Sequence, residues 1–266
     1  MQPNNSFKPN PLRGRLDFQA WGQQTTELPV MLSIDIHKAM RNLATRRPIF
    51  HSEADFQHAL AWELHVLDPS LEIRLEVPAS YKAQSRAFID LVVRKNRVTA
   101  FFELKYKTIN TSIKHNGEAF NLKTQGAQDQ GSYDFLKDIS RVESFVSGTD
   151  SAFGYAIMLS NDKRYWTQRR GVNPIDADFQ LLDDRILSGQ LAWAAHAGLG
   201  SIKGRESPLD FRRSYQIKWL PYSEIVESYA SQFRYLSLEI TAEECTRQLS
   251  LQQVPSDANA SRYLRG

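Results

Sequence analysis

Charged side chains stand inside two consecutive apolar segments, at residues 86–93 and 98–106. Each segment is typical of a strand buried on both faces of a sheet, where charge is not expected. The first segment contains Asp90, and the second contains Glu103 and Lys105. An unpaired charge in a protein interior is strongly unfavourable. The chain must therefore fold so that these groups are compensated, and a divalent metal ion would compensate the two carboxylates directly.

The connection between the two segments decides whether the charged groups can meet. Its polar sequence predicts a tight hairpin turn. With Lys95 and Asn96 as a two-residue loop, Asp90 falls opposite Phe101. Side chains alternate along a strand with period two, so Asp90 then shares a face with Glu103 and with the lysine two residues further on. A three-residue loop would place the two carboxylates on opposite faces.

A less specific interpretation is that these charges form ordinary ion pairs near strand ends, each worth about 0–1 kcal/mol. An Asp followed by Glu-x-Lys is a short pattern that also arises by chance. The flanking residues favour a buried site, because they make both faces of both segments apolar. They are Phe88, Ile89, Leu91, Val92, Val93, Val98, Phe101, Phe102 and Leu104.

A third piece of sequence precedes the two segments, Ser-Glu-Ala-Asp-Phe-Gln at residues 52–57. With Phe-Ile-Asp-Leu-Val-Val at 88–93 and Phe-Phe-Glu-Leu-Lys at 101–105, it resembles the pattern of the PD-(D/E)xK nuclease superfamily. That superfamily includes restriction endonucleases, Holliday junction resolvases and repair nucleases. Ile89 stands where the family often has a proline. The resemblance covers roughly residues 49–160.

The resemblance implies an α/β fold with a restriction endonuclease-like core of order αβββαβ, in which helices flank a mixed central sheet. We expect an extended or mobile N-terminal segment at residues 1–30 and a flexible tail at 250–266. Between them we expect a single nuclease-like domain at 31–249. Its core is expected at 49–160, followed by a C-terminal α+β elaboration at 161–249.

Hydrophobic spacing and capping signals predict the individual elements. Helices are expected at residues 31–44, from Ser52 onward, at 132–148, at 176–189 and at 222–230. Strands are expected at 71–77, 86–93, 98–106, 155–160, 215–220 and 233–240. Ser132 is the expected cap of the helix at 132–148, and Gly148 its end. The polar stretch at 108–130 is a candidate DNA-contacting flap, because connections this long are usually functional or disordered.

The resemblance also implies the chemistry of the site. Asp90, Glu103 and the backbone carbonyl of Leu104 would hold Mg²⁺, with Mn²⁺ able to substitute, because hard cations take oxygen ligands. Lys105 would orient the attacking water or stabilise the transition state. Glu53 would complete the catalytic set and is a further candidate ligand of the ion, directly or through water, although an acid in the first turn of a helix is also favoured by the helix dipole alone. Candidate nucleic-acid contacts are Gln57, Lys107, Lys114 and Lys123.

One further charged stripe lies on the helix expected at residues 132–148. Asp134, Lys137, Asp138 and Arg141 follow one another at helical spacing. In related nucleases a helix at this position often contributes polar groups to the site. A stripe of this kind is nevertheless more typical of a solvated face with ion pairs, which is the interpretation that we adopt.

Composition excludes several other classes of protein. The single cysteine, Cys245, permits neither an intramolecular disulfide nor a zinc cluster of cysteines. No apolar run is long enough to span a membrane, and the polar first fifteen residues lack a secretory apolar stretch, so we expect a cytoplasmic protein. Neither a phosphate loop nor a His-Glu-x-x-His motif occurs. The formal net charge of +3 permits a nucleic-acid partner without requiring one.

Together these observations predict a Mg²⁺-dependent nuclease, most simply an endonuclease, that hydrolyses phosphodiester bonds in DNA during phage defence, restriction or DNA repair. A homodimer and partner proteins of such a system are compatible with this prediction. RNA as the substrate and exonuclease action remain alternatives. A non-catalytic nucleic-acid- or protein-binding module on the same fold is the main competing hypothesis. The other is an unrelated α/β protein whose strand charges form ion pairs.

Overall fold

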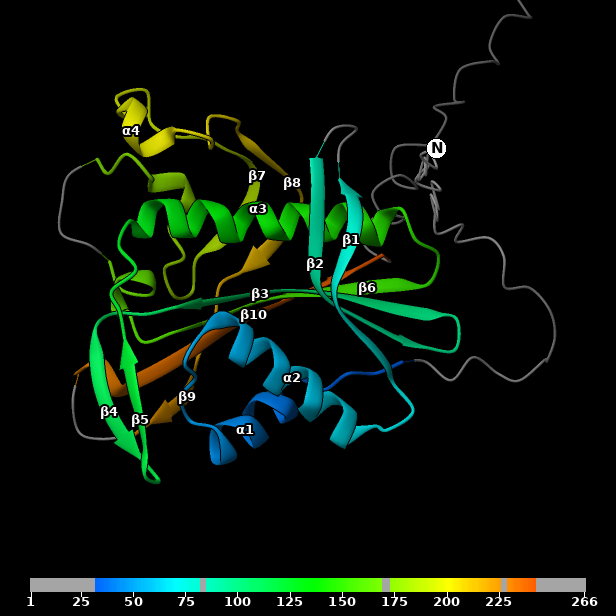
Figure 1. The fold of residues 1–266 in the computed structure, drawn as a ribbon. Helices are drawn as coiled ribbons and strands as arrows, with labels where there is room; N and C mark the ends of the chain where they lie inside the picture. The colour runs from blue at the N-terminus through cyan, green and yellow to red at the C-terminus, as the bar shows by residue number, and fades with distance from the viewer. Residues whose placement is uncertain (1–31, 82–84, 169–172, 226–228, 243–266) are drawn as a thin grey trace, which may run out of the picture. The chain divides into compact units, whose positions relative to one another are not determined.

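A mixed sheet of six strands forms the centre of the computed structural model, which describes residues 32–81, 85–168, 173–225 and 229–242 (Figure 1). The strand order is β1-β2-β3-β6-β10-β9. β3 and β6 are parallel, and the other neighbouring pairs are antiparallel. Helices flank this sheet, which makes the fold α/β as predicted. The strands are β1 (Glu72–Tyr81), β2 (Ser85–Lys95), β3 (Val98–Lys107), β6 (Ala152–Ser160), β9 (Trp219–Glu224) and β10 (Gln232–Thr241).

Two helices, α1 (Ile36–Arg46) and α2 (Glu53–Leu67), cover one face of the sheet (Figure 1). The side chain of Ser52 accepts a hydrogen bond from the Asp55 N–H, so α2 begins at the predicted cap. The helix expected at residues 31–44 is α1, which begins later because Asp35 is its cap.

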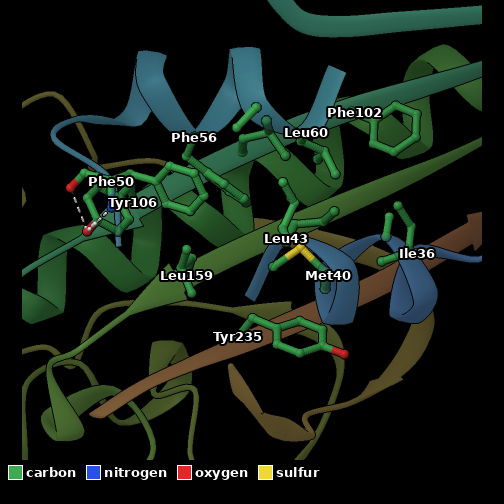
Figure 2. Close-up of a cluster of buried hydrophobic side chains, with 14 of the residues drawn as sticks. Ile36, Met40, Leu43, Phe50, Phe56, Leu60, Phe102, Tyr106, Leu159 and Tyr235 are labelled. Carbon is green, nitrogen blue, oxygen red and sulfur yellow. Dashed lines mark hydrogen bonds between the residues drawn. The ribbon is translucent and has the colours of Figure 1, made fainter. Parts of the chain in front are cut away.

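The core beneath these helices is built from large apolar side chains (Figure 2). Each such side chain contributes about 1.5–3 kcal/mol when it is fully buried. The O–H of Tyr106 donates to the Phe50 carbonyl over 3.0 Å, which ties β3 to the loop before α2. This core fixes α2 against β3. Its labelled members are Ile36, Met40, Leu43, Phe50, Phe56, Leu60, Phe102, Tyr106, Leu159 and Tyr235.

The opposite face of the sheet is covered by α3 (Gln128–Ser147) (Figure 1). The predicted end at Gly148 is confirmed, but the predicted cap is wrong, because α3 begins four residues before Ser132. Gly154 of β6 lets the helix lie directly on the sheet. A Cβ atom at Gly154 would be 2.3 Å from Cγ1 of Val142 and 2.8 Å from the Phe101 carbonyl oxygen. The close packing of α3 on the sheet therefore depends on having glycine, which has no side chain, at position 154.

The stretch at residues 108–130, the candidate DNA-contacting flap, contains a β-hairpin. Its strands are β4 (Thr111–His115) and β5 (Glu118–Leu122), joined by a turn in which Asn116 and Gly117 both have positive φ. Such φ values favour asparagine and glycine in tight hairpins. Ile113, Phe120 and Leu122 anchor the hairpin in the same core as α1 and α2.

The chain after β6 returns to the central sheet through β9 and β10. The strand expected at 233–240 is confirmed as β10, whereas the strand expected at 215–220 is divided between β8 and β9. The α-helix expected at 176–189 is wrong, because its apolar residues join the core of α3 from other elements, Phe179 from a single 3-10 turn and Leu187 from a strand. The remaining elements are η1 (Lys163–Tyr165), η2 (Ala177–Phe179), β7 (Ile186–Leu191), α4 (Leu199–Ile202), β8 (Leu209–Gln216) and η3 (Tyr229–Ser231).

Parts of three other predictions fall outside the described residues. The helix expected at 222–230 is wrong where it can be compared, since β9 occupies its start and η3 its end, and residues 226–228 lie outside the described part. The segments expected to be mobile, 1–30 and 250–266, are also outside it. No helix within the described ranges is long and apolar enough to cross a membrane.

Candidate functional site

The candidate site lies where β2 separates from β3. β2 pairs with β1 from Ser85 to Arg94, but it pairs with β3 only from Leu91 to Lys95. The other half of β2 separates from β3 and stays paired with β1 alone. We call this separation the fork, and Asp90 is the first residue of β2 beyond its pairing with β3. Beyond the fork, β2 no longer pairs with this edge of β3, so the N–H and C=O groups of β3 that point to this edge need other hydrogen-bond partners.

The register at the hairpin differs from the prediction without changing the faces of the strands. The turn falls at Asn96 and Arg97, one residue later than expected. Asn96 adopts a φ of 55°, which asparagine tolerates better than most residues. The expected pairing of Asp90 with Phe101 is therefore wrong by two residues. Because a shift of two keeps every side chain on its face, Asp90 is still near enough to Glu103 to influence its pKa.

Two carboxylates take the place of the missing strand at the fork. The Leu104 N–H donates to Oδ2 of Asp90 over 2.6 Å, and the Tyr106 N–H donates to Oε2 of Glu53 over 2.8 Å. Alternate residues of a strand direct their N–H groups to the same edge, so both carboxylates lie along this edge of β3. Gln57, one turn after Glu53 on α2, donates to the Asp90 carbonyl over 2.6 Å. The helix acid expected from the sequence is thus brought to the fork.

α3 supplies two charged residues that the sequence did not place at the site. Nζ of Lys105 lies 2.7 Å from Oδ2 of Asp138 and 3.3 Å from the Leu104 carbonyl oxygen. Nη2 of Arg141 contacts Oε2 of Glu103 and lies 3.0 Å from Oδ1 of Asp138. We call Glu53, Asp90, Glu103, Lys105, Asp138 and Arg141 the fork cluster.

The interpretation of the α3 stripe as one solvated face is therefore wrong for half of its members. Asp138 is buried, and the side chain of Arg141 is only 20% exposed, whereas Lys137 is exposed and Asp134 pairs with Arg205. Helical spacing alone gives no sign of this division. α3 lies close to the sheet at Gly154, and the side of the helix that carries Asp138 and Arg141 meets Lys105 and Glu103 of β3.

The fork cluster carries more negative than positive groups. Burial raises the pKa of Asp90 to about 6, and the carboxylates of Glu53 and Asp138 add to the rise, while the Leu104 N–H and Lys105 oppose it. Burial also raises the pKa of Glu103 well above its usual value, and Asp138 and Asp90 add to the rise against Arg141. Four carboxylates face two cations, so the cluster has an excess of two negative charges when all of its groups are ionised.

Lys105 stays protonated in this environment. Burial opposes its charge, but the carboxylates of Asp138, Glu53 and Asp90 outweigh that effect and raise the pKa of the amine. Its side chain is 18% exposed, so the ammonium group keeps some access to solvent. Lys105 is therefore suited to act as a fixed positive charge and is unsuited to accept a proton.

Three buried polar atoms of the cluster lack hydrogen-bond partners within the described part of the chain. One of them, Oδ2 of Asp138, is compensated by its ion pair with Lys105, and the other two have no ion-pair partner among the described residues either. These two are Oε1 of Glu103, in a side chain that is 1% exposed, and Nε of Arg141. An unsatisfied buried polar group costs on the order of 1–3 kcal/mol, and native proteins contain few of them. A carboxylate oxygen in this state, inside a cluster short of positive charge, points to a cationic ligand.

The donors at the fork fit a hard divalent cation, although they do not form a complete cage. Among the described residues, no group of three His, Cys, Asp or Glu side chains is arranged to hold a metal ion. The predicted ligands are two carboxylates, of Asp90 and Glu103, and the Leu104 carbonyl. Mg²⁺ characteristically binds through one or two carboxylates and fills its other positions with water or phosphate oxygens. The donor set therefore suits an ion that shares its coordination with solvent or substrate.

The residues expected to contact nucleic acid lie in different environments. Gln57 is buried, and its amide is bonded to the Asp90 carbonyl and to the Glu76 carboxylate. Lys114 and Lys123 are exposed on and after the β4–β5 hairpin, and Lys107 is half-buried at the end of β3. Gln57 thus belongs to the framework that holds Asp90, whereas the three lysines lie beyond the fork cluster.

Comparison with known proteins adds no relative. No protein-family model matches the chain, and no curated protein or solved structure is significantly similar to it. The three sequence segments and the geometry of the fork cluster therefore carry the functional argument.

Proposed function

We propose that the chain is a metal-dependent nuclease of the PD-(D/E)xK type that hydrolyses phosphodiester bonds in DNA. The observation that carries the proposal is the convergence of Glu53, Asp90, Glu103 and Lys105 at the fork, in a cluster where carboxylates outnumber cations. The order of elements supports it, because α2, β1, β2, β3, α3 and β6 follow the αβββαβ sequence that the resemblance implies, with the β4–β5 hairpin inserted before α3.

In this proposal Asp90, Glu103 and the Leu104 carbonyl hold Mg²⁺ or Mn²⁺. When bound, such an ion lowers the pKa of a water ligand and offsets negative charge on the phosphoryl group. Lys105 donates a hydrogen bond to the attacking water or to a phosphoryl oxygen, because its raised pKa keeps it charged. Glu53 holds the Tyr106 N–H and so fixes the edge of β3 on which the ligands stand.

Asp138 acts in this proposal as a positioning residue. Its two oxygens contact Lys105 and Arg141, so it sets the direction of both cations without being needed as a ligand. A supporting partner of this kind typically changes activity by 10- to 100-fold when it is replaced. The helix that carries it is held at a fixed height by Gly154.

A plasmid-nicking assay tests the proposal. We expect the full chain to cleave supercoiled DNA with Mg²⁺ or Mn²⁺ and to be inactive in EDTA. The variants Asp90→Asn, Glu103→Gln and Lys105→Met should each lose roughly 1000-fold or more of the activity. The amides are preferable to alanine because the carbonyl oxygen of Asn can still accept the Leu104 N–H. Asp134→Asn, on the outer part of α3, is the matched control and should cleave normally.

The same assay separates the competing hypotheses. Cleavage that survives all three substitutions would reject the assignment of the site. Metal-independent DNA binding without cleavage would favour a non-catalytic binding module on this fold. Labelled single- and double-stranded DNA and RNA, compared as substrates, distinguish the proposed deoxyribonuclease from a ribonuclease. Circular substrates without ends distinguish endonuclease from exonuclease action.

A further inference from the structure

The contact of Arg141 with Glu103 is incomplete on both sides. Arg141 makes two ion-pair contacts, one to Glu103 and one to Asp138, and both come from its Nη2 atom. Nε of the same guanidinium and Oε1 of Glu103 are buried and have no hydrogen-bond partner among the described residues. Arginine and a carboxylate bind most strongly through two parallel hydrogen bonds. This pair uses only one nitrogen of the guanidinium, so much of its capacity is unused.

A second arginine that contacts α3 shows what a complete pair looks like in this protein. Arg205 donates from Nε to Oδ1 of Asp134 over 2.7 Å and from Nη2 to Oδ2 over 2.6 Å. Each pair has one member on α3, and both place a guanidinium against a carboxylate. Only the pair at the fork leaves a buried donor and a buried acceptor without partners.

We propose that Arg141 is a displaceable counter-ion of the metal site. It neutralises Glu103 while no metal ion is bound, and a divalent cation takes over that carboxylate when it binds. The inference rests on the proposed function, because it requires Glu103 to be a metal ligand. Two cations at one buried carboxylate repel each other strongly in a medium of low dielectric. Binding of the ion therefore weakens the Arg141 contact, and the contact weakens binding of the ion to the same degree.

Asp138 keeps the displaced guanidinium at the site. Its Oδ1 lies 3.0 Å from Nη2 of Arg141, so the arginine retains one carboxylate partner when it leaves Glu103. Nε and the remaining N–H groups are then available to a phosphate oxygen, which guanidinium groups bind well. A metal ion and a phosphate would thus favour each other's binding. The ion takes the place of Arg141 at Glu103, and the phosphate binds the guanidinium that is released.

Mn²⁺ binding to the full chain without nucleic acid tests this inference. Electron paramagnetic resonance titration measures the dissociation constant directly and does not depend on catalysis. Arg141→Gln should bind Mn²⁺ about tenfold more tightly than the unaltered protein. Arg205→Gln removes the same charge from the complete pair and should leave the constant unchanged. Lys105→Gln removes a charge within the cluster that does not contact Glu103, so its effect should be smaller than that of Arg141→Gln.

A measurement on the unaltered protein covers the case in which Arg141→Gln does not fold. In protein with ¹⁵N-labelled arginine, Mg²⁺ should shift the Nε resonance of Arg141 and leave that of Arg205 in place, with Arg141→Lys supplying the assignment. An unmoved Arg141 resonance at saturating Mg²⁺, or an Arg141→Gln affinity equal to or weaker than that of the unaltered protein, overturns the inference and leaves the metal site standing. Absence of Mn²⁺ binding in every protein overturns both the inference and the proposed function.

Discussion

Two groups of charges on α3 are built in opposite ways. Asp134 and Arg205 form a pair of one carboxylate and one guanidinium, with two hydrogen bonds and partial exposure to solvent. One turn later, Asp138 and Arg141 join a buried cluster in which carboxylates outnumber cations and two polar atoms have no partner in the described part of the chain. A matched pair holds two segments together. An unmatched buried cluster is costly for structure alone, so it indicates a site for a ligand.

The largest expected difference between the two groups is in activity. Asp138→Asn should lower DNA cleavage by about 100-fold, because Lys105 and Arg141 lose the carboxylate that orients them. Asp134→Asn makes the same chemical change one turn earlier and should leave cleavage within about twofold of normal. Initial nicking rates at saturating Mg²⁺ measure both. Equal losses of cleavage in the two variants would show that activity depends no more on the fork cluster than on the Asp134–Arg205 pair.

A second prediction uses the dependence of stability on pH. The pKa of Asp90 is raised in the folded protein from 3.8 to about 6, so between these values the folded state binds more protons than the unfolded state. In EDTA, the contribution of Asp90 to the free energy of unfolding is therefore full below about pH 4 and is lost as the pH rises through 6. The loss should be on the order of 3 kcal/mol.

Urea unfolding at several pH values between 4 and 8 measures this effect. Asp90→Asn should remove the part of the fall that Asp90 contributes and leave the part that follows from the raised pKa of Glu103, whereas Asp134→Asn should retain both. Saturating Mg²⁺ should reduce the fall in the unaltered protein, since an ion favours the ionised carboxylate. A fall of equal size in Asp90→Asn and in the unaltered protein would show that another group is responsible.

A third prediction tests how α3 is positioned over each group. Gly154→Ala places a methyl group against Cγ1 of Val142 and the Phe101 carbonyl oxygen, and it should cost about 1–3 kcal/mol of stability. It should also lower cleavage, because α3 must move away from the sheet that carries Glu103. Gly131→Ala meets the hydroxyl end of Tyr165 and serves as the comparison on α3 itself. Its effect on cleavage should be smaller, since Gly131 lies far along the helix from Arg141.

The smallest expected effect concerns the complete pair. Arg205→Ala should lower the free energy of unfolding by only about 0–1 kcal/mol, because the pair is partly exposed. The loss should shrink further in high salt, which screens exposed charges. Thermal unfolding at low and high ionic strength measures both values. A loss of several kcal/mol would show that this pair stabilises the fold far more than a partly exposed ion pair is expected to.

The sequence predicted the elements whose signals are local. Ser52 and the apolar residues of α2 at helical spacing gave the helix and its start, and the apolar context of Asp90 and Glu103 gave two strands. Both strands are buried around these residues, but Phe88 of β2, which was expected to be buried, is exposed. The charged residues themselves indicated the site, because burial makes charge exceptional. Three residues of the fork cluster, Asp90, Glu103 and Lys105, were singled out in this way, and Glu53 was added by the resemblance.

Features that depend on tertiary packing were not predicted. The turn position depends on the φ of Asn96, and the face of α3 that meets the sheet depends on Gly154, which lies on a different element. Asp138 and Arg141 were therefore placed in solvent. In the segment at residues 176–189, apolar residues at helical spacing pack against α3 from short turns and a strand, because tertiary contacts override weak helix propensity.

The fork also affects how copies of this chain meet one another. An open edge of a sheet offers free N–H groups to any extended peptide and is a common starting point for aggregation. Here the amide groups of Leu104 and Tyr106 are already occupied by Asp90 and Glu53. A strand from a second molecule would have to displace two carboxylates before it could pair at this edge. The acids at the fork therefore protect the opened sheet against intermolecular strand addition.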